Sequence, residues 1–134
     1  MWQMNTKILM AGSAAFLGVS GVLLEFFPHE VLAYAGVMPT GFAPVVLQML
    51  GAAYFGLAMT NWMAKSVLIG GIYARPLAIG NLAHFLIAAL ALVKYAATAG
   101  TSPAVCAVAA VYSAFAVLFG IVLFTHPASS GKQA

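Results

Sequence analysis

The chain has 134 residues, of which five are Lys or Arg and two are acidic, so that only 5% carry a charge. Soluble domains carry about 25% charged residues, and a soluble chain this short could not bury a composition that is 64% hydrophobic. These numbers exclude soluble globular, disordered and nucleic-acid-binding proteins, and the single Cys excludes an intrachain disulfide or a cysteine-based metal cluster. The mean hydropathy of +1.06 indicates an integral membrane protein.

Four apolar stretches are long enough to cross a hydrocarbon core about 30 Å thick, which takes about 20 helical residues. Each stretch is bounded by Pro, Gly or a charge, and none alternates apolar and polar residues as a β-barrel strand does. The sequence therefore predicts membrane-spanning helices over residues 8–27, 42–64, 77–97 and 104–125. They form a single membrane domain over residues 1–134, with a frayed tail over 127–134.

The few charges predict an orientation. An even number of spans puts the N-terminus, the loop over residues 65–76 and the C-terminal tail on one side of the membrane. Four of the five cations fall on that side: Lys7, Lys65, Arg75 and Lys132. The positive-inside rule then predicts a multi-pass membrane protein with both termini in the cytoplasm.

Residues 29–36, in the first outer loop, have helical character and end at Gly36. They predict a short helix that either connects the first two spans or lies on the membrane surface. Small residues recur four apart in three spans and favour close helix packing: Ala14 and Gly18, Ala52 and Gly56, Ala116 and Gly120. The predicted fold is all-α: an up-down four-transmembrane-helix bundle with a short interfacial helix after the first span.

Polar residues gather near the cytoplasmic ends of the second and third spans. Helical spacing puts some of them on one face of each span, and antiparallel spans could bring the two faces together at similar depth. They are Tyr54, Asn61, Lys65, Arg75, Asn81 and His84. One interpretation is a site for a lipid headgroup, a quinone-type ring or a small anion. The other is a seam of interhelical hydrogen bonds, with both cations only fixing the topology.

A second polar group is predicted at the outer side, where Gln48 and Tyr95 accompany two charges. Glu25 ends the first span and Lys94 lies near the end of the third. An ion pair between them would reduce the cost of holding each charge near lipid. Alternatively, each side chain extends separately to the headgroups.

The sequence offers no nucleophile with an adjacent base and no set of metal ligands. A haem between membrane helices would need a partner for His84, and His29 and His126 lie outside the spans on opposite sides. We therefore expect no cofactor.

Several segments resemble small four-helix bacterial inner-membrane proteins that are mostly of unknown function, and the DoxX-like proteins have a similar size and four-helix layout. The resemblance covers most of the chain and is carried by the segments 26–36, 61–65, 70–76 and 80–85, with the aromatic-Pro pair Phe27-Pro28, Gly70-Gly71 and Gly80-Asn81 among them. It implies the four-helix layout and a place in the bacterial inner (plasma) membrane, and it says little about activity.

These observations favour a non-enzymatic inner-membrane protein that binds a small amphiphile, such as a lipid or a quinone-like molecule, or a membrane partner through the cytoplasmic-side cluster. The protein would act alone, as a homo-oligomer or within a larger membrane complex. A small oligomeric transporter or channel is the alternative, with Asn61, Arg75, Asn81 and His84 along a hydrated route. A third hypothesis is a membrane enzyme that uses His84 as acid or base.

Overall fold

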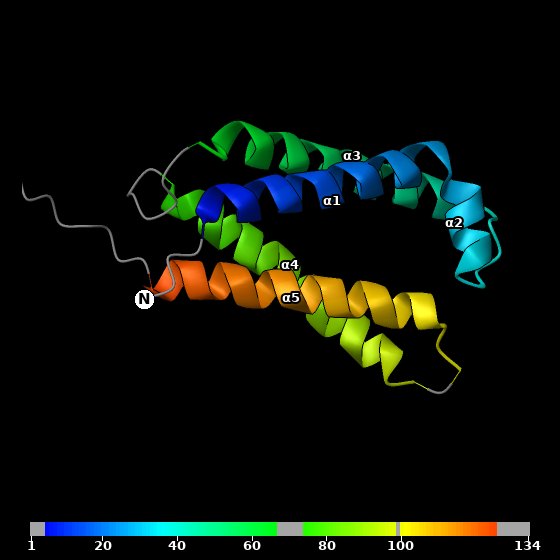
Figure 1. The fold of residues 1–134 in the computed structure, drawn as a ribbon. Helices are drawn as coiled ribbons and strands as arrows, with labels where there is room; N and C mark the ends of the chain where they lie inside the picture. Colours follow the sequence, from blue (N-terminus) through cyan, green and yellow to red (C-terminus); the bar gives the residue numbers. More distant parts are fainter. Residues whose placement is uncertain (1–4, 67–73, 99, 126–134) are drawn as a thin grey trace, which may run out of the picture. The chain divides into compact units, whose positions relative to one another are not determined.

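The computed structural model describes residues 5–66, 74–98 and 100–125, and within these ranges the regular structure is entirely helical (Figure 1). The helices are α1 (Thr6–Phe26), α2 (Pro28–Tyr34), α3 (Ala43–Ala64), α4 (Arg75–Ala96) and α5 (Pro103–Thr125). All except α2 are long and apolar enough to cross a membrane. The four predicted spans are therefore confirmed, with ends that differ by no more than two residues. Gly70, Gly71, Lys132, His126 and the predicted tail lie outside the described residues.

Proline marks the start of four helices. Pro28 and Pro103 are the first residues of α2 and α5, and Pro44 and Pro76 are the second residues of α3 and α4. Proline is tolerated there because the first turn has no intrahelical acceptor for the missing N–H. Ser102 adds a cap to α5, since its hydroxyl accepts a hydrogen bond from the Val105 N–H at 3.4 Å.

The predicted glycine stop of the short helix is present. Gly36 has a φ of +74°, which a residue with a side chain rarely adopts. Its N–H bonds to the Ala33 carbonyl at 3.0 Å, and the Val37 N–H bonds to the Leu32 carbonyl at 2.9 Å. This pair of bonds is the Schellman arrangement, which satisfies carbonyls that a helix end would leave without partners.

The chain divides into two compact units. The N-terminal unit contains α1, α2 and α3, and the C-terminal unit contains α4 and α5. Exposed side chains on both units are mostly large and apolar, with Met63 at 77% exposure and Phe124 at 81%. Such surfaces suit lipid rather than water.

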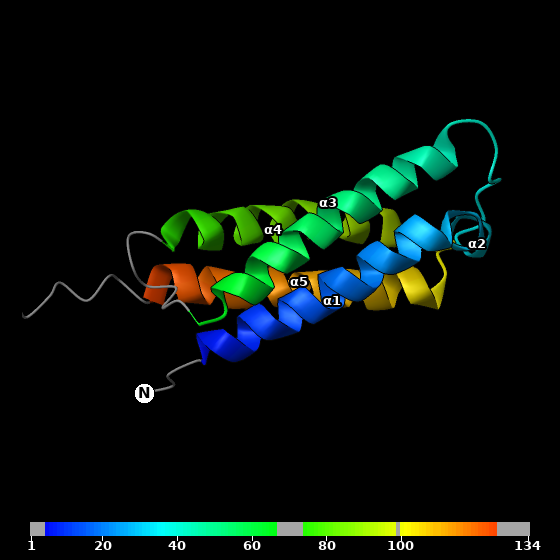
Figure 2. The same cartoon turned by 90° about the horizontal axis from the view of Figure 1, so that it is seen from above.

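In the N-terminal unit, α1 and α3 lie side by side and antiparallel (Figures 1 and 2). They touch at two glycines. A Cβ on Gly21 would lie 2.8 Å from the Gly51 carbonyl oxygen, and a Cβ on Gly51 would lie 2.8 Å from the Gly21 carbonyl oxygen. One turn away, a Cβ on Gly18 would be 3.7 Å from the Ala58 Cβ. The helices therefore meet backbone to backbone, as small residues allow in membranes.

The small residues of α3 that face α1 differ from the predicted pair. Gly18, predicted to pack, does approach α3, but a Cβ on Gly56 would meet nothing within 4 Å. Gly51 and Ala58 form the contact instead, because they lie seven residues apart on one side of the helix.

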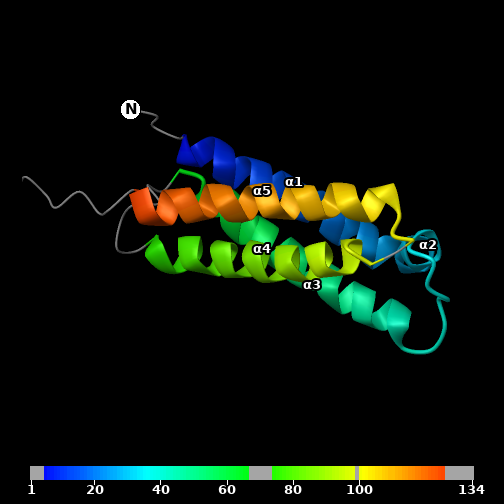
Figure 3. The ribbon, with the colours of Figure 1, turned by 90° about the horizontal axis from the view of Figure 1, so that it is seen from below.

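In the C-terminal unit, α4 and α5 are antiparallel neighbours held together by aromatic side chains (Figure 3). Phe85 is fully buried and stacks on Phe115 and Phe119, with ring centroids 4.8 and 5.7 Å apart. Tyr112 packs on Phe85 at 5.5 Å. Aromatic pairs at these distances add to the packing energy of the two helices.

We predict that Gly51→Ala destabilises the protein by about 1–3 kcal/mol, because the added methyl group meets backbone atoms that cannot rotate away. Gly56→Ala is the matched control, since it adds the same methyl group to open space in the same helix. Unfolding of the purified protein in mixed micelles, titrated with a denaturing detergent, measures both. Equal stabilities of the two variants would contradict the backbone contact.

Candidate functional site

Asn61 links the two long helices of the N-terminal unit. Its side chain is fully buried, and its amide nitrogen donates to the Ser13 hydroxyl at 3.0 Å. Ser13, also fully buried, donates in turn to the Met10 carbonyl of its own helix at 3.0 Å. This chain of hydrogen bonds gives the Asn61 amide a partner on the first span, which the sequence analysis did not foresee.

Lys65 follows Asn61 by four residues, at the C-terminal end of α3. Its ammonium nitrogen lies 3.0 Å from the centre of the Trp62 indole ring, a cation–π contact. Trp62 is about half exposed at 52%, and Trp and Lys near a helix end are typical of the membrane–water boundary. The contact suits an anchor at that boundary.

On α4, Asn81 and His84 have different surroundings. Asn81 is fully buried, and its amide nitrogen donates to the Leu77 carbonyl, one turn earlier in the helix, at 3.0 Å. His84 is half-buried and packs on Phe85 and Tyr112, with ring centroids 5.1 and 5.8 Å away. The contact of His84 with Tyr112 was not predicted. The signal for it in the sequence was Tyr112 itself, a polar aromatic residue within the last apolar span.

The residues of the predicted cytoplasmic-side cluster are divided between the two units. Three belong to α3 in the N-terminal unit and three to α4 in the C-terminal unit: Tyr54, Asn61 and Lys65, then Arg75, Asn81 and His84. Glu25 and Lys94 are divided in the same way. A shared site for the six residues and an ion pair between the two charges therefore stay predictions.

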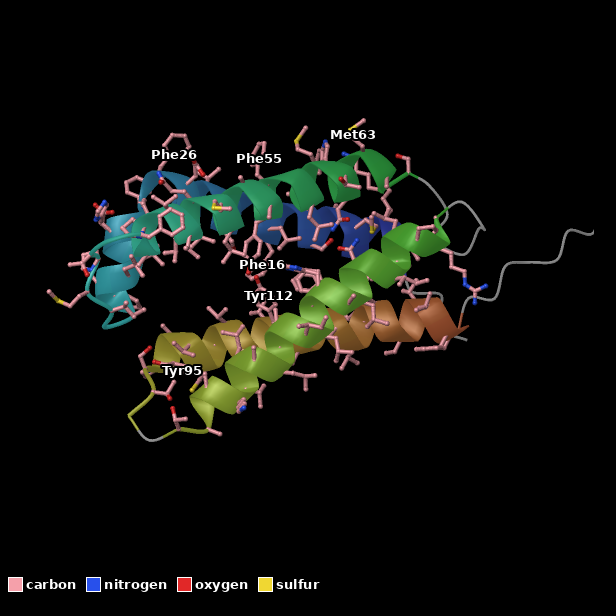
Figure 4. The ribbon with its side chains drawn as sticks, turned by 180° about the vertical axis from the view of Figure 1, so that it is seen from behind. Phe16, Phe26, Phe55, Met63, Tyr95 and Tyr112 are labelled. Atoms are coloured by element: carbon pink, nitrogen blue, oxygen red, sulfur yellow. The ribbon has the colours of Figure 1, made fainter. Side chains whose placement is uncertain are left out.

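A groove of about 410 Å³ runs over the place where α1 and α3 cross. Glycine forms its floor, because Gly21 and Gly51 hold the helices together without filling the space above them. Figure 4 shows Phe26 and Phe55 projecting from the same face of the helix pair. The lining residues are Gly21, Val22, Glu25, Phe26, Gly51, Ala52 and Phe55. Apart from Glu25, these lining residues are apolar.

Glu25 lies in the last turn of α1, where its side chain is half-buried. Carbonyls in the last turn of a helix lack intrahelical partners. The Gln48 amide nitrogen supplies one by donating to the Glu25 backbone oxygen at 3.2 Å. Of the predicted outer group, the structure thus brings Glu25 and Gln48 together, through the backbone of one and the side chain of the other.

Among the residues that the structure describes, no three His, Cys, Asp or Glu side chains gather where they could hold a metal ion. Comparisons with protein families, curated proteins and solved structures give no match. The resemblance to DoxX-like proteins is therefore still an expectation from the sequence.

We predict that Ser13→Ala and Asn61→Ala are coupled in a double-mutant cycle. Each change removes one side of a buried hydrogen bond, so the double variant should lose less stability than the sum of the two single losses. Interhelical hydrogen bonds in membrane proteins average about 0.6 kcal/mol, which sets the expected coupling.

Thr60→Ala is the control for this cycle. Its hydroxyl is exposed and bonds to the Gly56 carbonyl within its own helix at 2.9 Å, so it should show no coupling to Ser13→Ala. Strict additivity of Ser13→Ala and Asn61→Ala in detergent-titrated unfolding would contradict the assigned hydrogen bond.

Proposed function

We propose that this chain is an integral membrane protein that binds a small amphiphile, whose apolar tail lies in the groove between α1 and α3. The groove itself carries the proposal. Its volume of about 410 Å³ falls within the range of small-molecule sites, and its lining combines apolar side chains with one polar group.

The shape of the groove suits an alkyl chain. The two glycines let a tail approach the helix backbones, and Phe26 and Phe55 provide apolar walls. Both phenylalanines are substantially exposed, at 72% and 49%, so a tail can enter from the lipid. The described lining residues include one ionisable side chain and no nucleophile–base pair, so they support binding rather than catalysis.

This proposal places the binding site at the groove rather than at the predicted cytoplasmic-side cluster. The hydrogen bond from Asn61 to Ser13 and the contact of Lys65 with Trp62 support roles in packing and anchoring for those two residues. Glu25, in contrast, lines an open apolar surface.

We place the protein in a bacterial inner membrane, as an up-down bundle with both termini in the cytoplasm and α2 at the outer interface. The distribution of cations supports this orientation. The groove then opens toward the outer leaflet, because Glu25 is at the end of α1 opposite to the cytoplasmic Lys7.

A photolabelling experiment tests the proposal. The probe is a long-chain alcohol that carries a diazirine midway along its chain, added to the purified protein in phosphatidylcholine nanodiscs. We expect saturable labelling of the α1 and α3 peptides around the groove. Ala52→Phe should reduce it several-fold, because the aromatic ring fills the groove.

Ala53→Phe is the matched control, since residue 53 is exposed, lies on the same helix and does not line the groove. It should label as the native protein does. Labelling that cannot be saturated, or that responds equally to both substitutions, would contradict a binding site at this groove.

A further inference from the structure

The chemistry of the groove constrains the headgroup of its ligand. Among the described residues that line the groove, Glu25 alone is ionisable, and it stands in the last turn of α1, which contains no basic residue. The carbonyls at a helix C-terminus carry a partial negative charge, so the helix end adds to the field of the carboxylate. A cation placed there is stabilised by both.

The neighbouring groups favour the same charge. Gln48 directs its amide nitrogen to the Glu25 backbone oxygen and not to its carboxylate. The adjacent Phe26 lines the groove as well, and an aromatic face attracts ammonium groups.

We infer that the ligand is a single-chain cationic amphiphile, an alkyl amine or quaternary ammonium compound, whose tail fills the groove and whose head lies against the Glu25 carboxylate. This inference rests on the proposed function and names the ligand class of the same site. A phospholipid is disfavoured, because its phosphate would meet Glu25 and a helix C-terminus, and none of the described lining residues is a cation.

Lys94 is the competing cation that the sequence predicts for the same carboxylate. If Lys94 neutralised Glu25, the groove would have no preference for a cationic head. The two interpretations therefore give opposite results in one measurement.

The experiment compares two photoprobes with identical diazirine chains, one ending in a primary amine and one in a hydroxyl, in phosphatidylcholine nanodiscs. The amine probe should bind the native protein about fivefold more tightly, the size expected for a partly exposed ion pair. In Glu25→Gln this ratio should fall to about one. Comparing the ratio between variants removes differences in how the probes partition into the bilayer.

Glu30→Gln is the matched control, because it removes the other acidic residue, which is exposed on α2 and does not line the groove. It should keep the native ratio. Retained binding of the hydroxyl probe to Glu25→Gln shows that this variant has folded with its groove intact.

Each other outcome has a distinct meaning. If both probes label the groove equally in the native protein, or if Glu25→Gln keeps the amine preference, the inference fails and the proposed function stands. If the preference emerges only in Lys94→Gln, Lys94 is the partner of Glu25 and the inference fails. If neither probe labels the groove in a saturable way, the proposed function fails as well.

Discussion

The N-terminal unit depends on one constraint: the backbones of α1 and α3 must touch at Gly21 and Gly51. Lipid tails are as apolar as leucine, so helices in a membrane gain little from burying apolar side chains against each other. Close van der Waals contact and hydrogen bonds between helices supply the stability instead. The interface between α1 and α3 has both: the backbones touch at the two glycines, and further along the helices Asn61 donates a hydrogen bond to Ser13. That bond forms because the glycines bring the helices close.

The same crossing creates the groove. Two glycines hold the backbones together but place no side chain above the contact, whereas larger neighbours such as Val22 and Phe55 stand on either side. A dip in the surface of this helix pair is the geometric result. An empty apolar dip forfeits dispersion contacts along its lining, which the proposed amphiphile would supply. Stability and the proposed binding would thus depend on the same pair of glycines. A larger side chain at Ala52 would separate the two effects, because it fills the dip and leaves the glycine contact unchanged.

The helices could be predicted from the sequence because composition requires them in a membrane, and proline and glycine mark their ends. Pro28, Pro44, Pro76 and Pro103 begin helices in the structure, and Gly36 ends one. The groove could not be predicted in this way. Its floor depends on which small residue of α3 meets α1, and in a helix with glycines at positions 51 and 56 the spacing alone fits either. The Ser13 partner of Asn61 was missed for the same reason: a lone serine within an apolar helix gives no signal until its neighbour is known.

The position of Glu25 follows from the break between α1 and α2. Pro28 cannot donate a hydrogen bond to the Leu24 carbonyl, so α1 ends at Phe26 and its last carbonyls need other donors. Gln48 of α3 satisfies one of them at Glu25, which fixes the end of α1 against α3 beside the groove. A carboxylate at the end of a membrane-spanning helix costs less than one in the middle of the span. The break that ends the helix therefore also allows an acidic residue in the groove lining, and the inferred preference for a cationic amphiphile rests on that residue.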